Sequence, residues 1–209
     1  GYMLGEHGIW KKQNLFEQTT KQPLLIYAPG YSGGTPCEEI VEMIDIYPTV
    51  AELANLDSPT NIDGKSLTEL LKNPKTSWNR PAFTQQARTP NSTYDPLSTE
   101  LGGTRIFSQI PDFNDPATIW GRSIRVKRYR YTEWNEGKDG VELYDYQTDP
   151  DERINLANDP KHSDLVKELS TKLRSSYDPE EIAKTRETIA KNREEAGQAV
   201  EATYPAIFY

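Results

Sequence analysis

The stretch SIRVKRYRYTEW, residues 123–134, followed by VELYDY, residues 141–146, decides the fold. Both segments are rich in β-branched and aromatic side chains, which favour β-strands. The linking residues, 135–140, include Gly137 and Gly140 and suit a tight connection. The pattern therefore predicts an antiparallel hairpin, with residues 123–134 as one strand and residues 141–146 as its partner.

Helical patterns flank this hairpin. Residues 162–176 carry regularly spaced leucines, typical of an amphipathic helix: Leu165, Leu169 and Leu173. Residues 45–54 predict an earlier helix that begins at Asp45. Its buried stripe should comprise Val50, Leu53 and Ala54. Residues 65–72 predict a short helix, and residues 178–198 predict a highly charged one with an acidic first turn.

The remaining segments are less regular. Residues 23–29, PLLIYAP, form an apolar run bounded by prolines, which predicts a buried strand. Regular signals thin out from residue 75 to residue 120, where prolines repeatedly interrupt the chain. A stretch of this length is usually a functional surface loop or a disordered one. Within it, residues 81–85 suit a strand.

The composition excludes several classes of protein. The 209 residues carry 24 basic and 32 acidic side chains, and the resulting net charge of −8 argues against a general nucleic-acid binder. Apolar stretches are far shorter than the roughly 20 residues that a membrane-spanning helix requires. Cys37 is the only cysteine, so this chain builds neither an internal disulfide nor a thiolate zinc site. Because the chain opens at Gly1 in a loop-like stretch, we expect a cut or processed N-terminus.

The glycine-rich opening holds the first candidate site residues. Lys11 and Lys12 follow Gly8-Ile9-Trp10, where glycine lets the backbone approach a ligand closely. A lysine ammonium in such a loop suits an anionic group. The alternative is a pair of adjacent lysines in water. His7 is a base, a ligand or a structural histidine, and Glu6 is an anchor of the loop.

Other charged residues are less informative. The acidic residues show no spacing that predicts a metal site, and Asp149, Asp151 and Glu152 fit turns and caps. Five basic residues lie between Arg122 and Arg130. A strand with one solvated face explains that run as well as an anion site does.

The opening LGEHGIWKK, residues 4–12, resembles the late active-site segment of type I, formylglycine-dependent sulfatases. Further stretches resemble the same family in the same order: residues 45–54 with 64–67, residues 129–134 with 142–145, and residues 149–152 with 155–156. Within the family the likeness is greatest to iduronate-2-sulfatase, in FTQQAR at residues 83–88 and SIR at residues 123–125. Three positions depart from that enzyme's pattern: Gln13, Gln86 and Ala87.

The resemblance implies an α/β fold, namely the C-terminal part of an alkaline-phosphatase-like sulfatase, with a small four-stranded antiparallel sheet plus a helix as a subdomain. It divides the chain into parts. Residues 1–74 would end the large α/β domain and include the late active-site loop, and residues 75–120 would form a long loop region on the substrate side. Residues 121–177 would form the sheet-and-helix subdomain, and residues 178–209 a charged helical extension.

The same resemblance implies a hydrolase of sulfate esters. Such enzymes use a formylglycine, made from a Cys or Ser in a C/S-x-P-x-R motif, and a calcium ion that polarises the sulfate. Lys12 coincides with the family's late active-site lysine and is predicted to be catalytic. Gln85, Arg88 and His7 are predicted to bind the sulfated carbohydrate substrate.

Neither the nucleophile nor the calcium ligands are expected in this chain. Cys37 stands in TPCEE, residues 35–39, without the required Pro and Arg. We therefore expect formylglycine and calcium to belong to an N-terminal sulfatase part upstream of Gly1, and this chain alone to be inactive. The family implies a periplasmic or extracellular protein, or a lysosomal one in a eukaryote.

Two other functions stay open. A phosphate or phosphonate ester hydrolase of the same superfamily would carry a Thr or Ser nucleophile and a two-zinc site. A noncatalytic binding module would accompany an upstream part that lacks both the nucleophile and the acidic ligands.

Overall fold

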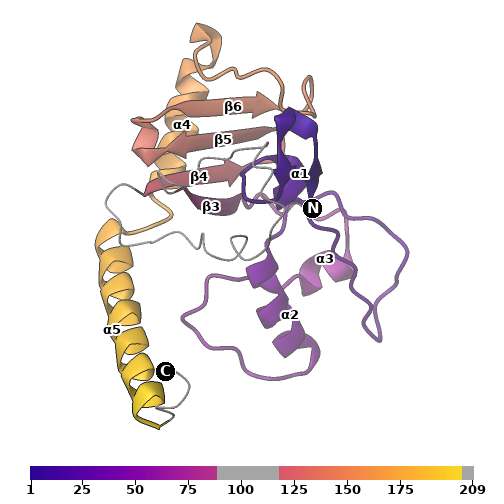
Figure 1. Ribbon diagram of the computed structural model, residues 1–209. Coiled ribbons are helices and arrows are strands. Elements are labelled where there is room, and N and C mark those ends of the chain that lie inside the picture. The colour runs from indigo at the N-terminus through magenta and orange to yellow at the C-terminus, as the bar shows by residue number, and fades with distance from the viewer. Residues whose placement is uncertain (89–117, 204–209) are drawn as a thin grey trace.

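The computed structural model describes residues 1–88 and 118–203, and its largest element is an antiparallel sheet of four strands (Figure 1). The strands lie side by side in chain order: β3 (Ala82–Arg88), β4 (Ile119–Arg125), β5 (Tyr129–Trp134) and β6 (Val141–Asp145). The predicted hairpin is confirmed as β5 and β6, joined through the short helical turn η4 (Asn135–Gly137).

The prediction of a single strand over residues 123–134 is wrong, because these residues divide between β4 and β5. The Val126 N–H donates to the Tyr129 carbonyl oxygen at 2.8 Å and closes a tight turn between the two strands. The alternating pattern continues on both sides of this turn, so the sequence alone does not reveal the break.

The segment from residue 75 to residue 120 is not a loop throughout. β3 pairs with β4 along its whole length, from Ala82 opposite Arg125 to Arg88 opposite Ile119. The strand expected at residues 81–85 is therefore confirmed and is longer, because β4 supplies partners for the additional residues. Residues 89–117, the rest of the predicted loop region, lie outside the described residues.

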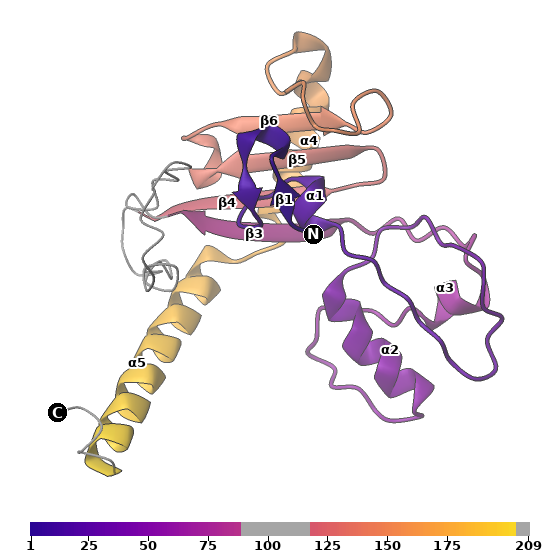
Figure 2. The same ribbon diagram turned by 45° about the vertical axis from the view of Figure 1, so that its right-hand side comes forward.

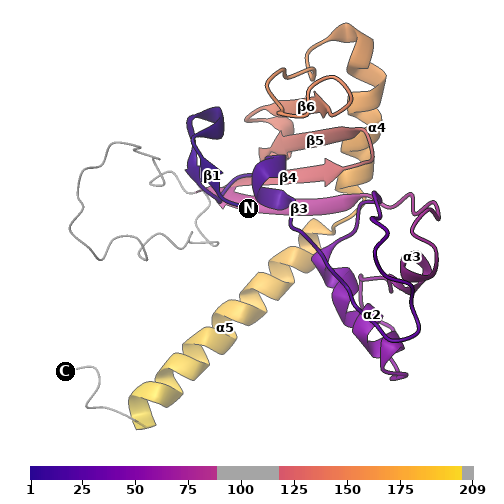
Figure 3. The ribbon, with the colours of Figure 1, turned by 90° about the vertical axis from the view of Figure 1, so that its right-hand side faces the viewer.

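The helix α4 (Ser163–Arg174), preceded by the short turn η5 (Pro160–His162), covers one face of the sheet (Figure 3). Side chains alternate between the two faces of a strand, and those that face α4 form the main core. This cluster comprises Ile124, Tyr131, Leu143, Leu169 and Leu173. The leucine spacing in residues 162–176 is thereby confirmed as the packing stripe of α4.

The N-terminal segment lies against the opposite face of the sheet (Figures 2 and 3). It contains a small hairpin and one helical turn: β1 (Met3–Leu4), η1 (Glu6–Gly8), β2 (Trp10–Lys11) and α1 (Glu17–Thr20). Met3 and Leu15 are buried, so the segment has apolar anchors of its own. One face of the sheet is thus covered by α4, and the N-terminal segment with its glycine-rich loop lies on the other.

Two further helices lie beside the sheet, below it in the view of Figure 1. They are α2 (Ile46–Leu53), preceded by the short turn η2 (Met43–Asp45), and α3 (Thr68–Lys72). Leu67, Leu70 and Trp78 form a small core here, and α3 confirms the short helix expected within residues 65–72.

The buried stripe predicted for residues 45–54 is wrong. Val50 is 57% exposed, whereas Thr49 is buried. The reason is a hydrogen bond: the Leu67 N–H donates to the Thr49 hydroxyl at 2.8 Å, which turns a polar side of α2 inward. Asp45 is also buried, but its carboxylate accepts the Lys65 N–H rather than capping α2.

The buried strand predicted for residues 23–29 is also wrong. Leu25 and Tyr27 are 89% and 94% exposed, while Ile26 packs against the core around Trp78. Within the described part of the chain no strand pairs with this run, so it has neither a hydrogen-bonded neighbour nor a cover for these side chains.

The last described element, α5 (Pro179–Thr203), extends away from the sheet in all three views (Figures 1–3). Glu180 and Glu181 lie in its first turn, as the sequence predicts. None of the helices among the described residues is long and apolar enough to cross a membrane.

Candidate functional site

The glycine-rich opening folds as a tight hairpin that presents Lys12. Gly5 and Gly8 adopt φ values of 125° and 72°, which favour glycine, and their N–H groups bond within the turn. The Glu6 carboxylate accepts the Leu4 N–H at 2.7 Å, which confirms Glu6 as an anchor of the loop. Lys12 follows β2 directly and is exposed. The loop is therefore built to hold a surface lysine at a defined place.

His7, at the tip of this loop, is held by an aromatic contact. Its backbone is left-handed, with φ 52°, and its ring stacks on the Phe16 ring with centroids 4.0 Å apart and planes 4° apart. Phe16 in turn lies against Tyr144 of β6, with centroids 6.1 Å apart. His7 remains exposed, and the Phe16 ring beneath it fixes the orientation of its imidazole.

The contact continues across the sheet to its edge strand. The Tyr144 hydroxyl donates to Glu142 Oε2 at 3.2 Å, and the Trp134 indole N–H donates to Glu142 Oε1 at 3.0 Å. The Arg88 guanidinium lies over the Trp134 ring, 3.7 Å from its centroid. We call the connected set His7, Phe16, Tyr144, Glu142, Trp134 and Arg88 the aromatic row. It brings two predicted substrate residues, His7 and Arg88, onto one side of the sheet.

The chemistry of the aromatic row is that of a rigid platform with a cation at one end. Burial raises the pKa of Tyr144, so its hydroxyl stays protonated and remains a donor to Glu142. Burial lowers the pKa of Arg88, but an arginine is charged at any physiological pH. A planar guanidinium over an indole is a favourable arrangement that also keeps its edge free for an anion.

The structure does not bring Gln85 to this side. Gln85 lies opposite Arg122 in the β3–β4 pair and shares the face of Phe83, which pairs with the core residue Ile124. It is therefore on the α4 side of the sheet, whereas Arg88 is on the side of Trp134. Its predicted contact with substrate stays a prediction.

A second set of polar residues lies beneath the loop and was not predicted. Glu17, Arg125, Arg130, Tyr146 and Glu152 form what we call the buried ion cluster. Arg130 donates to Glu17 at 2.5 Å and to Glu152 at 2.9 Å, and both Arg130 and Glu152 are almost fully buried. Arg125 donates to Glu17 at 3.2 Å, so Arg125 and Arg130 of the basic run are paired inside the protein, whereas Lys127 and Arg128 of the same run remain exposed.

Opposing effects set the pKa values in this cluster. Burial raises the pKa of Glu17, but the guanidiniums of Arg125 and Arg130 outweigh it, so the pKa lies below its ordinary 4.5. Burial raises the pKa of Tyr146 as well. The cluster therefore keeps Glu17 charged and Tyr146 protonated at neutral pH.

No residue of the described chain fits the cofactors that the resemblance implies. Among the described residues, no group of three or more His, Cys, Asp or Glu side chains is arranged to hold a metal ion. Cys37 is exposed and lacks the Pro and Arg of the formylglycine motif. We therefore derive no chemical step through calcium or formylglycine from these residues.

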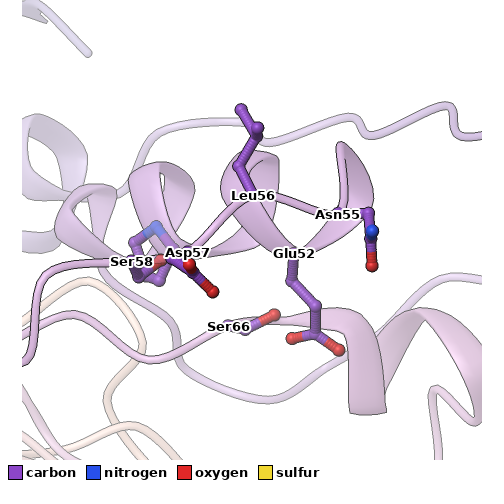
Figure 4. A pocket seen from close by; sticks show the side chains of 7 residues that line it. Glu52, Asn55, Leu56, Asp57, Ser58 and Ser66 are labelled. Atoms are coloured by element: carbon purple, nitrogen blue, oxygen red, sulfur yellow. The ribbon is translucent and has the colours of Figure 1, made fainter.

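A cavity of about 460 Å³ lies elsewhere, at the C-terminal end of α2 (Figure 4). It is lined by Pro48, Glu52, Asn55, Leu56, Asp57, Ser58 and Ser66. Hydrogen bonds from Ser66 and Thr68 lower the pKa of Glu52, which points toward Ser66 in Figure 4. The Glu52 carboxylate accepts the Thr68 hydroxyl and so links α2 to α3. The cavity includes none of the predicted site residues.

Comparison with known proteins places the chain in a family. The family model described as N-sulphoglucosamine sulphohydrolase, C-terminal, matches residues 5–90 and 112–178. Arylsulfatase K of Mus musculus is 30% identical over 84% of this chain and 28% of its own length. Delta 4,5-hexuronate-2-O-sulfatase of Bacteroides thetaiotaomicron is 28% identical over 79% of this chain and 30% of its own length.

A solved structure shares the fold. The phosphonate monoester hydrolase of Silicibacter pomeroyi matches with a TM-score of 0.63 and 25% identity, over 84% of this chain and 32% of that one. The chain thus spans about a third of the length of its relatives, with the mixed α/β fold of an alkaline-phosphatase-like sulfatase. With the family model matching most of its length, the chain belongs to the N-sulphoglucosamine sulphohydrolase C-terminal family.

Proposed function

We propose that the intact protein hydrolyses sulfate esters of a sulfated carbohydrate and that this chain supplies the substrate side of its active site. The observation that carries the proposal is the family match, which includes the loop of Lys12 and the strands of the aromatic row. The nucleophile and the calcium ion would come from an N-terminal sulfatase part, because the described residues offer no donor set for them.

In this proposal the Lys12 ammonium stabilises the negative charge of the sulfate. Its ammonium is a compact cation with donors in several directions, which suits an oxyanion. Charge that develops on sulfate oxygens during transfer is stabilised by a cation already in place. The tight turn at Gly5 and Gly8 supports this role, since it holds the loop without blocking access to Lys12.

Arg88 and His7 bind the sugar in this proposal. An arginine that lies over an indole presents a planar edge to a carboxylate or sulfate. His7 lies at the other end of the aromatic row and can hydrogen-bond a hydroxyl. A relative named for removing a 2-O-sulfate from a hexuronate favours a 2-O-sulfated uronate as the substrate. Such polymers lie outside the cytoplasm, so we propose a periplasmic, extracellular or lysosomal location.

Sulfate release from a 2-O-sulfated uronate disaccharide tests the proposal in the intact protein. We expect Lys12→Ala to lower kcat at least about tenfold, because the sulfate loses a charge-assisted contact. Lys172→Ala is the control, since Lys172 is exposed on α4 on the other side of the sheet and should leave turnover unchanged. Unchanged turnover in Lys12→Ala contradicts the role given to Lys12.

A second function has one observation in its favour, the structural match to a phosphonate monoester hydrolase. The same preparation is therefore assayed with a phosphonate monoester. Faster hydrolysis of the phosphonate than of the sulfated disaccharide favours that function. Absence of turnover with both substrates favours a noncatalytic binding module.

A further inference from the structure

We propose that Arg130 and Glu152 are positioning residues, which act through Glu17 to hold the loop of residues 3–16 and with it Lys12 and His7. The effect on turnover rests on the function proposed above, whereas the effect on the loop does not. The sequence motifs assign neither residue such a role.

Arg130 is the centre of the contact. It projects from β5 toward the N-terminal segment with 2% of its side chain exposed. One guanidinium nitrogen, Nη2, donates to Glu17 Oε2 at 2.5 Å and to the Thr20 hydroxyl at 2.9 Å, both on α1. Its Nε donates to Glu152 Oε1 at 2.9 Å. One side chain of the sheet therefore binds α1 and the turn after β6 at the same time.

Glu152 completes the attachment from the other direction. Its Oε2 accepts the backbone N–H of Glu17 at 2.7 Å, and its Oε1 also accepts the Tyr146 hydroxyl. Its backbone lies in the left-handed region, with φ 56°, which a glutamate rarely adopts. Such backbone strain persists where surrounding contacts over-determine the geometry. The turn therefore holds Glu152 in one orientation, with its carboxylate fully buried and bonded on both oxygens.

Hydrogen bonds of the neighbouring residues couple the position of Glu17 to the position of the loop. The Phe16 N–H donates to Asn14 Oδ1 at 3.0 Å, and the Thr19 hydroxyl donates to the same oxygen at 2.7 Å. The base of the loop is thereby tied to α1 within a few residues of Lys12. Phe16 also carries the stacked ring of His7. Displacing α1 must therefore displace the supports of both predicted site residues.

The nature of these contacts favours precise placement over general stability. A buried ion pair adds little net stability, since desolvation opposes the Coulombic attraction. It does penalise any arrangement in which a buried charge lacks its partner. The planar fork of arginine adds directional bonds that a lysine lacks. This cluster thus selects one placement of α1 on the sheet.

The experiment compares Glu152→Gln with a matched control, Glu133→Gln, in the intact protein. Glu133 is equally buried and is paired with Arg174 of α4 at 3.0 Å, but it lies on the other face of the sheet. Backbone amide hydrogen exchange of residues 3–20 is measured by mass spectrometry below the unfolding temperature. We expect exchange there to be about tenfold faster in Glu152→Gln and unchanged in Glu133→Gln.

Two milder variants keep the test decisive if Glu152→Gln does not fold. Tyr146→Phe removes only a hydroxyl, and Arg130→Lys keeps the charge but loses the fork. Both should accelerate exchange in residues 3–20 by about threefold. The proposal is overturned if no folded variant of the cluster accelerates exchange in this segment, or if Glu133→Gln accelerates it equally.

Kinetics separate this proposal from the proposed function. With a 2-O-sulfated uronate disaccharide, Glu152→Gln should lower kcat about tenfold with little change in KM, while Glu133→Gln retains wild-type kcat. Wild-type kcat in a Glu152→Gln protein whose loop exchanges faster overturns the claim that the loop position matters for turnover. If wild-type protein releases no sulfate but the exchange results hold, the proposed function fails and the positioning of the loop stands.

Discussion

Arg88 shows how one aromatic ring gives a flexible side chain a fixed place. It stands at the end of β3, and its guanidinium lies over the Trp134 ring, 3.7 Å from the ring centroid. Trp134 is itself held by its indole bond to Glu142. The charge at the end of the aromatic row is thus held by stacking on an aromatic ring, an arrangement that suits the recognition of an anionic ligand.

We expect Arg88→Lys to weaken substrate binding, because a lysine keeps the charge but neither stacks as a plane nor binds bidentately. In the intact protein, KM for a 2-O-sulfated uronate disaccharide should rise roughly fivefold with kcat little changed. Arg153→Lys is the control, since Arg153 is exposed and pairs only with Asp151 among the contacts described. An unchanged KM in Arg88→Lys contradicts the assignment of Arg88 to the sugar site.

At the scale of elements, the Trp134 side chain of β5 packs directly over the backbone of β4, because Gly121 has no side chain there. Gly121 pairs directly with Trp134, and an added Cβ would overlap the six-membered part of the indole ring. The aromatic row therefore depends on a glycine in the interior of a strand, where glycine otherwise weakens the strand.

Gly121→Ala should destabilise the protein by about 1–3 kcal/mol, because Trp134 must move to admit the methyl group. Urea unfolding followed by tryptophan fluorescence measures the change. Gly33→Ala is the matched control: no heavy atom lies within 4 Å of its added Cβ, so stability should change by no more than about 0.5 kcal/mol. Equal stability of the two variants would show that the sheet adapts without moving Trp134.

The docking of α1 should depend on pH through Glu17. Its pKa is lower in the folded protein than the ordinary 4.5, so its stabilising contribution is fully present above that value. The contribution is lost as the pH falls through the folded pKa. We expect the urea midpoint to fall between pH 7 and about pH 3, and to fall less in Glu17→Gln. The same pH dependence in both proteins would contradict this role of Glu17.

At the scale of the molecule, residues 23–29 and α2 both expose large apolar side chains. Leu25 and Tyr27 are almost fully exposed, and Tyr47, Val50 and Leu56 are each more than half exposed. Large apolar side chains that are exposed in number often mark an interface. Because the chain spans about a third of the length of its relatives, we propose that an N-terminal part covers this surface.

The chain expressed alone should therefore bind an apolar fluorescent dye strongly, whereas the intact protein should not. Replacing Leu25 and Tyr27 by lysine should reduce dye binding to the isolated chain about twofold, because these are the most exposed large apolar side chains among the residues that the structure describes. Lysine at Leu15, which is buried, should not reduce it. Equal dye binding by the intact protein and the isolated chain would contradict the proposed cover.

Local pattern was enough to predict the β5–β6 hairpin, the leucine stripe of α4 and the loop that presents Lys12. These features depend on neighbours in sequence, because side-chain alternation and helical spacing repeat over a few residues. The turn that separates β4 from β5 and the exposure of residues 23–29 depend on which strands are available as partners. Periodicity alone cannot supply that information.

Only the tertiary structure decided the rest. Glu17 and Arg130 are 113 residues apart in the chain, and no spacing in the sequence relates them. Glu152 lies in a segment that reads as an ordinary turn, yet its side chain is fully buried. Arg130 and the Glu17 N–H, which come from distant segments, bind its carboxylate. The sequence by itself thus determined which chemical groups the loop displays, and the packing of distant segments decided where those groups are held.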